Sequence, residues 1–87
     1  MWHVYVLQSM KNGRLYVGST NDLKRRLAEH NSGKGKYTRS TRPFRLVYEE
    51  QCEERLEARR RELFLKSGKG REFLKNGPLA QQVRAVA

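Results

Sequence analysis

Five residues with side chains suited to catalysis occur in order along this chain: Tyr5, Tyr16, Arg26, His30 and Glu62. They supply two phenols, a permanent cation, an imidazole and a carboxylate. Together these groups suit a metal-assisted attack on a phosphodiester, because a carboxylate holds a metal and a cation offsets the charge on phosphate. Each residue type is common by itself, so the hypothesis depends on where the fold places them.

The two tyrosines fall in a predicted β-hairpin. The stretches on either side of Asn12-Gly13 are rich in β-formers, and Asn-Gly is a strong hairpin signal because both residues tolerate positive φ. Strand periodicity places Tyr5, Tyr16 and Gly18 on one face. A loop of only Asn12 and Gly13 offsets the tyrosines by about four residues, roughly 13 Å, so their hydroxyls converge only with sheet twist or a wider loop. We expect Gly18 to let a substrate backbone approach closely.

A helix is predicted over residues 23–31, preceded by the N-cap chemistry of Thr-Asn-Asp and ended by Ser-Gly. Helical periodicity places Leu23, Leu27, Arg26 and His30 on one stripe. The leucines anchor this stripe to the sheet, which sets Arg26 and His30 on its inward face or at its edge. The simpler alternatives are an arginine that extends to solvent from the stripe edge and a hydrogen-bonded structural histidine.

A basic, glycine-rich connection follows over residues 32–45. Lysines and arginines alternate there with small hydroxyl residues, a composition typical of phosphate contacts that read no sequence. The residues predicted to bind nucleic acid are Lys34, Lys36, Tyr37, Arg39 and Arg42, with the tyrosine as a stacking face. A merely solvated loop is the alternative interpretation.

The second half of the chain predicts a strand over residues 44–49, a helix over 53–67 and one more helical turn over 71–75. Glu62 lies on the second helix within about 60° of its apolar positions, so it can sit beside packed side chains. Three arginines precede it, and a salt-bridged surface glutamate is the ordinary interpretation of that pattern.

Composition narrows the class of partner. The 87 residues suffice for one domain, and the net charge of +10 comes from 19 Lys and Arg against 9 Asp and Glu. Such an excess indicates a polyanion, most often nucleic acid and less often a ribosomal surface or anionic lipid. The single cysteine, Cys52, offers no disulfide or metal cluster within the chain. No signal peptide or membrane span is predicted, and we expect a cytoplasmic protein with no membrane partner.

The motifs resemble those of the GIY-YIG nuclease family, most closely its small single-domain bacterial branch. The matching runs are Val4-Tyr5-Val6, Tyr16-Val17-Gly18, Ser19-Thr20-x-Asp22-Leu23-x-x-Arg26-Leu27-x-x-His30 and Arg60-Arg61-Glu62-x-x-x-Lys66. The resemblance covers residues 2 to about 75 and implies an α+β fold, a small three-stranded antiparallel sheet flanked by helices. We therefore expect a nuclease domain over residues 1–76 and a short polar tail over 77–87.

The resemblance also implies hydrolysis of DNA phosphodiesters with one divalent metal, Mg²⁺ or Mn²⁺. By position, Tyr5 and Tyr16 are the motif tyrosines, Arg26 the family arginine and Glu62 the metal ligand, while His30 stands where part of the family has histidine. Val4 replaces the first motif's glycine, as is common in this branch. A late asparagine of some members has only Asn76 as a weak counterpart.

Several points stay open at this level. A phenol is a poor base at neutral pH unless cations lower its pKa, and His30 competes with both tyrosines for the role of base. The leading hypothesis is a metal-dependent DNA endonuclease of low sequence specificity, structure-selective in DNA repair or processing. A non-catalytic basic module that binds DNA or RNA is the alternative, and a small ribosome-associated protein is a third.

Overall fold

The computed structural model describes residues 1–33 and 40–79. In order, the elements of this part are β1 (Trp2–Ser9), β2 (Leu15–Thr20), α1 (Leu23–Ser32), β3 (Phe44–Cys52), α2 (Arg55–Lys66) and α3 (Gly68–Asn76). The predicted α+β class, with a three-stranded antiparallel sheet flanked by helices, is confirmed. Within the described ranges, no helix is long and apolar enough to cross a membrane.

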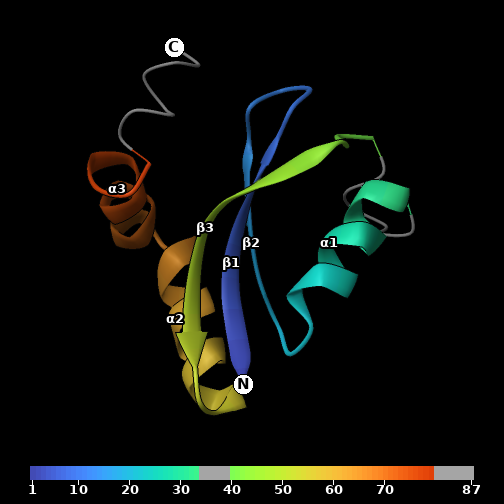
Figure 1. The fold of residues 1–87 in the computed structure, drawn as a ribbon. Helices are drawn as coiled ribbons and strands as arrows, with labels where there is room; N and C mark the ends of the chain where they lie inside the picture. Colours follow the sequence, from blue (N-terminus) through green and yellow to red (C-terminus); the bar gives the residue numbers. More distant parts are fainter. Residues whose placement is uncertain (34–39, 80–87) are drawn as a thin grey trace.

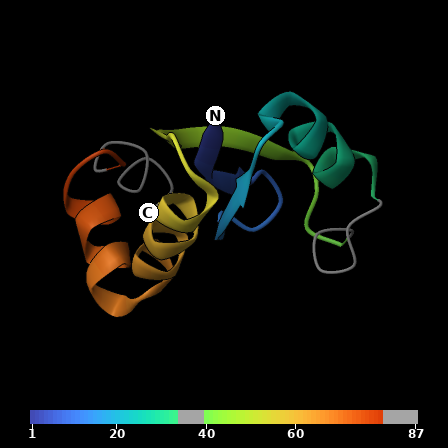
Figure 2. The same ribbon diagram turned by 90° about the horizontal axis from the view of Figure 1, so that it is seen from below.

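The sheet separates the helices into two layers. Its strand order is β2-β1-β3, so β1 lies in the centre and pairs antiparallel with both neighbours. Figure 1 shows α1 on one side of the sheet and α2 and α3 on the other, and Figure 2 shows the same three layers from below. β2 is therefore an edge strand that both helical layers flank.

Alternating side chains of β1 supply both halves of the core. Val4 and Val6 point to the layer of α2 and α3, where they pack with buried residues that include Leu65. Tyr5 and Leu7 point to the layer of α1, where Leu23 and Leu27 pack against them, as the helical stripe predicts. The predicted common face of the tyrosines is thus the face that α1 covers.

The hairpin loop is wider than the Asn12-Gly13 turn predicted from sequence. The Ser9 amide donates to the Arg14 carbonyl at 2.9 Å and the Gly13 amide donates to the Ser9 carbonyl at 2.9 Å, so the loop runs from Met10 to Gly13. The predicted register is therefore wrong by two residues: Tyr5 pairs with Gly18, and Leu7 pairs with Tyr16. This shift makes the two tyrosines diagonal neighbours on one face.

α1 has the ends that the sequence predicts, within one residue. The Asp22 side chain accepts a hydrogen bond from the Arg25 amide at 3.1 Å, which satisfies one of the free amides of the first turn. Gly33 ends the helix with φ of 83°, a left-handed conformation that glycine adopts without strain. These caps fix the rotation of the stripe that carries Arg26 and His30.

The region after α2 is more helical than predicted. Ser67 ends α2 and caps α3, because its hydroxyl accepts a hydrogen bond from the Gly70 amide at 3.2 Å. α3 spans nine residues rather than the one turn predicted over 71–75. A Cβ on Gly70 would lie 1.9 Å from the Phe64 carbonyl oxygen, so only glycine permits this approach of α3 to the end of α2. Leu79, from the predicted tail, is buried in the same core, so packing reaches at least that residue.

Candidate active site

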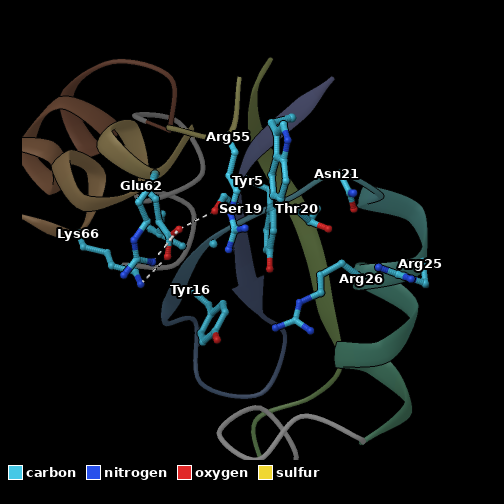
Figure 3. A pocket seen from close by; sticks show the side chains of 14 residues that line it. Tyr5, Tyr16, Ser19, Thr20, Asn21, Arg25, Arg26, Arg55, Glu62 and Lys66 are labelled. Carbon is cyan, nitrogen blue, oxygen red and sulfur yellow. Dashed lines mark hydrogen bonds and ion pairs between the residues drawn. The ribbon is translucent and has the colours of Figure 1, made fainter. Parts of the chain in front are cut away.

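A pocket of about 560 Å³ opens across the edge of β2. It receives side chains from both helical layers and from the strands between them (Figure 3). Four of the five residues predicted to be catalytic line it: Tyr5, Tyr16, Arg26 and Glu62. The fifth, His30, lies directly behind the tyrosines, so the fold gathers the whole predicted set around one edge strand.

The two tyrosines meet at His30. The Tyr5 hydroxyl lies 3.1 Å from His30 Nε2, and both groups are buried. The Tyr16 ring stands edge-on to the imidazole with centroids 5.0 Å apart. The wider hairpin loop makes this possible, because it brings Tyr16 diagonally next to Tyr5. The structural role that we considered for His30 and a role in proton transfer are both compatible with this position.

Gly18 makes room for Tyr5. A Cβ at Gly18 would lie 2.4 Å from the Tyr5 hydroxyl oxygen and 2.6 Å from the ring carbon that carries it. The phenol of the central strand therefore extends across the cross-strand glycine toward the open edge of β2. The phenol of Tyr5 fills the space that a side chain at position 18 would need, and Gly18 itself lines the pocket, so close approach of a substrate backbone there stays a prediction.

Arg26 lies at the edge of the α1 stripe, on the pocket. Its guanidinium points from α1 toward the two tyrosines (Figure 3). The side chain is 45% exposed and lies 4.0 Å from Glu29, its one ion-pair partner within the described ranges. A loose, half-exposed contact of this kind leaves most of the guanidinium's donors available to an incoming anion.

The environment sets the protonation of Tyr5 and His30. Burial raises the pKa of the Tyr5 phenol, although the Arg26 guanidinium beside it acts in the opposite direction. Burial and the charge of Arg26 lower the pKa of His30. At neutral pH the phenol is therefore protonated and the imidazole neutral, and the phenol is the donor of their hydrogen bond in the imidazole tautomer whose proton is on Nδ1. Arg26 alone does not bring the pKa of Tyr5 below its usual value.

Glu62 approaches the same pocket from the opposite layer and is 5% exposed. The Ser19 hydroxyl donates to Oε1 at 2.6 Å, and the Lys66 ammonium donates to Oε2 at 2.8 Å. Burial raises the pKa of this carboxyl, but Lys66 and Ser19 outweigh burial and the pKa is lowered. The ordinary interpretation of Glu62 as a surface residue is wrong: it is ion-paired, but it is buried and ionised inside the pocket.

Sequence reasoning missed several pocket residues on α2. They recur at every third or fourth position and so form one helical stripe with the glutamate: Arg55, Arg59, Glu62 and Lys66. The Glu62–Lys66 spacing is also the favourable i,i+4 order for an ion pair. No sequence pattern indicated Ser19, because its hydrogen bond to Glu62 forms only where β2 lies against α2.

Four of the five residues predicted to bind nucleic acid are outside the described part of the chain. Lys34, Lys36, Tyr37 and Arg39 all lie there. The fifth, Arg42, belongs to the described part of the chain. It is exposed, and its guanidinium lies over Gly33 at the end of α1 rather than in the pocket. The weak candidate Asn76 is exposed at the end of α3 and does not line the pocket.

The donor set limits the kind of metal that the pocket suits. Among residues 1–33 and 40–79, no group of three His, Cys, Asp or Glu side chains is placed to hold a metal. Glu62 is the one carboxylate among the described lining residues, beside five cations: Arg25, Arg26, Arg55, Arg59 and Lys66. A single hard oxygen ligand fits Mg²⁺, which keeps most of its waters and shares the phosphate of a substrate. It does not fit zinc.

Comparison with known proteins gives a consistent result. The family model described as the GIY-YIG catalytic domain matches residues 1–76. A UPF0213 protein from Desulfotalea psychrophila is 51% identical over 67 residues, which span 75% of this chain and 60% of that protein. A UPF0213 protein from Streptococcus agalactiae serotype V is 48% identical over 65 residues, which span 74% of this chain and 73% of the relative.

A solved structure is similar as well. The solution NMR structure of a UPF0213 protein from Bacillus halodurans is 42% identical, and the match covers 87% of this chain and 84% of that one with a TM-score of 0.53. The matched family model extends from β1 through α3, and therefore includes every residue assigned to the pocket above.

Proposed function

The chain belongs to the GIY-YIG family of nucleases, and we propose that it is a divalent-metal-dependent endonuclease that hydrolyses DNA phosphodiester bonds. One observation carries the proposal. The phenols and the guanidinium on one face of the sheet and the carboxylate on the other line a single pocket at the edge of β2. A phosphodiester lying across this edge would meet a cation, a proton-transfer pair and a metal ligand at once.

Arg26 is the group suited to the charge that develops on phosphate. Its guanidinium is permanently charged, half-exposed and directed into the pocket (Figure 3). The planar array of donors matches two phosphate oxygens at once, which a lysine ammonium cannot do. Removing such a group costs about 3 kcal/mol or more of transition-state stabilisation, a loss of roughly a hundredfold in rate.

Tyr5 and His30 are suited to take a proton from the attacking water. Tyr5 is too weak a base to do so alone, because burial raises its pKa. Nε2 of the neutral imidazole lies 3.1 Å from the hydroxyl, however, and in the tautomer with its proton on Nδ1 it can take the phenol's proton as the phenol receives another from water. Tyr16, which contacts the same imidazole, would orient the water or the phosphate.

Glu62 is the residue that would hold Mg²⁺ or Mn²⁺. When bound, the ion supplies Lewis-acid stabilisation of the scissile phosphate and lowers the pKa of a coordinated water. Ser19 holds Oε1 in a fixed orientation, so the carboxylate is prepared before the ion arrives. Lys66 shares Oε2 and is 48% exposed, so its ammonium can withdraw into solvent.

The proposed substrate is DNA, bound with little sequence preference. The net charge of +10 and the cationic lining support binding through phosphates, and such contacts carry no sequence information. Action on branched or damaged DNA in repair or processing is consistent with these contacts, because backbone geometry then decides where the enzyme binds. Binding should weaken steeply with salt, and a flat slope would contradict it.

A nicking assay tests the proposal. Plasmid and labelled branched DNA are incubated under single-turnover conditions with Mg²⁺ and Mn²⁺, for the parent and for Arg26→Ala, Tyr5→Phe and Tyr16→Phe. We expect cleavage by the parent that chelator abolishes, and a loss of about a hundredfold or more for Arg26→Ala. The tyrosine with the larger loss is the one that handles the water. A parent that cleaves no DNA form with either metal contradicts the proposal.

A non-catalytic binding module is the second candidate, and one observation favours it. Both Glu62 oxygens already have donors, with Lys66 on Oε2 and Ser19 on Oε1. A carboxylate neutralised in this way could be purely structural. The binding module predicts salt-sensitive DNA binding without cleavage and without any response of the pocket to divalent ions.

A further inference from the structure

A second groove opens beside the candidate active site, on the layer of α2 and α3. It has a volume of about 750 Å³ and lies between the β1–β2 hairpin and the two helices. Tyr16, Val17 and Lys66 line both this groove and the active-site pocket. The two hollows therefore share a wall, which includes Lys66, the donor to Glu62.

The charged residues described along this groove are all cations. Its charged residues come from the hairpin and from both helices: Arg14, Lys66, Arg71 and Lys75. No aspartate or glutamate occurs among the described residues that line it. Within residues 1–33 and 40–79, the ion pairs include none of Arg14, Arg71 and Lys75, and all three are exposed. Charge in this position is not compensated by the fold and is available to an anion.

The floor of the groove is aliphatic. Leu65 and Leu74 are fully buried beneath it, and Leu15 and Val17 are partly buried. An apolar floor under a charged rim suits a ligand with one anionic edge and one uncharged edge. A nucleotide strand has this character, since its phosphates lie on one side of its sugars and bases.

We propose that this groove, defined by Arg14, Leu65, Arg71, Leu74 and Lys75, binds the backbone of the DNA strand on one side of the cleaved phosphate. The proposal rests on the proposed function for the statement that this strand is the one cleaved. Among the described residues, Lys66 is the one cation that lines both the groove and the active-site pocket. The strand then crosses the β2 edge from α3 toward α1, past both tyrosines.

The rim of the groove points to a polyanion rather than to a protein partner of mixed charge. A mixed interface pairs charges of both signs, whereas every charged residue in the described lining is a cation. α3 supplies two of these cations on one side while Gly70 packs against α2 on the other. α3 therefore forms one wall of the groove.

The test compares two pairs of cations, one that lines the groove and one that does not. The groove variant is Arg71→Gln with Lys75→Gln, and the matched control is Lys69→Gln with Arg60→Gln, both exposed and outside both hollows. Each removes the same charge. Both are made in a Glu62→Gln background so that binding is measured without cleavage, using fluorescently labelled branched DNA across a range of salt concentrations.

We expect the groove variant to reduce the slope of log K against log salt by about one for each phosphate that the protein no longer neutralises, and the control to leave it nearly unchanged. Circular dichroism confirms that both variants are folded. Equal reductions in the two variants would overturn the proposal, because they would mean that only total charge matters.

Cross-linking gives a second readout. The photoreactive amino acid p-benzoyl-phenylalanine in place of Lys75 should cross-link to the labelled DNA, and in place of Lys69 it should not. Cross-linking at Lys69 alone would overturn the assigned path. Neither measurement needs catalysis, so failure of the groove is distinguishable from failure of the parent to nick DNA.

Discussion

Two carboxylates, Glu62 and Glu50, are held at opposite edges of the same sheet, and they are held in different ways. Glu50 on β3 accepts both Arg61 hydrogen bonds at 2.8 Å and the Tyr48 hydroxyl at 2.7 Å. Glu62 accepts single hydrogen bonds from Ser19 and Lys66 and a longer one from Arg59 at 3.4 Å. It faces the active-site pocket, which Glu50 does not line. Both pKa values are lowered, so both groups are ionised at neutral pH.

The difference lies in how easily the donors can be replaced. The Arg61 guanidinium occupies both oxygens of Glu50 with fixed geometry and also lies 4.7 Å from the centre of the Phe64 ring. The Lys66 ammonium is a single donor on a flexible stem, and half of its side chain is in solvent. We interpret the first site as structural and the second as a carboxylate kept ready for a cation. Arg61 and Glu62 are adjacent in sequence, so one turn of α2 contributes to both.

The largest expected effect comes from exchanging each carboxylate for its amide. Glu62→Gln should lower the single-turnover nicking rate about a hundredfold or more, because the charged metal ligand is lost. It should retain or strengthen DNA binding, because it removes a negative charge. Glu50→Gln should keep most of the nicking activity. Equal activity of the two variants would remove the distinction between the sites.

The next effect is on folding stability. Arg61→Met should lower the free energy of unfolding by about 1.5–3 kcal/mol, since it leaves a largely buried carboxylate without its charged donor. Arg59→Met is the matched control on the same helix. Its guanidinium is 60% exposed and 3.4 Å from Glu62, so its loss should cost less than about 1 kcal/mol. Urea denaturation followed by circular dichroism measures both, and a reversed order would contradict the structural role of Arg61.

The Lys66 ammonium should compete with the metal ion for the Glu62 carboxylate. We expect Lys66→Met to raise the affinity for Mn²⁺ by up to about fivefold, the factor that corresponds to ~1 kcal/mol for a half-exposed ion pair. Trp2 is the single tryptophan and lines the pocket, so its fluorescence reports ion binding independently of activity. Lys69→Met, outside the pocket, is the control. Weaker binding in the Lys66 variant would show that the ammonium does not compete.

The smallest expected effect is on how folding stability depends on pH, where His30 and the two carboxylates should act in different pH ranges. The pKa of His30 is lowered from 6.5, so the unfolded chain binds its proton first, and stability should begin to fall as pH drops below 6.5. Glu50 and Glu62 have pKa values lowered from 4.5, so their contribution is lost only below 4.5. His30→Gln should remove the loss of stability that begins below pH 6.5 and keep the loss that begins below pH 4.5. A stability profile unchanged by that variant would contradict the buried neutral imidazole.

Much of the fold followed from local pattern. The alternation of β1 placed Tyr5 with Leu7 on one face and Val4 with Val6 on the other, because successive strand side chains point to opposite sides. The caps of α1 and its leucine stripe placed Arg26 at the pocket in the same way. These are properties of a few neighbouring residues, and residue type and spacing suffice to specify them.

Other features depended on contacts between distant segments. The hairpin loop from Met10 to Gly13 is stabilised in part by tertiary contacts, since the Met10 amide donates to the Pro43 carbonyl and the Ser9 hydroxyl donates to the Thr41 carbonyl. The tight Asn12-Gly13 register was therefore wrong. The length of α3 likewise depended on the close approach of Gly70 to α2.

The sequence by itself determined which groups this protein offers: two phenols on one face, a cation on the stripe of α1, and a strongly basic surface. Only the tertiary structure decided that Glu62 joins them. Its helical position alone predicted a surface ion pair, and burial against Ser19 exists because β2 packs on α2. Helix and strand periodicity fix the direction of a side chain within its own element. The meeting of groups from opposite faces is fixed by how the layers pack around a shared edge strand.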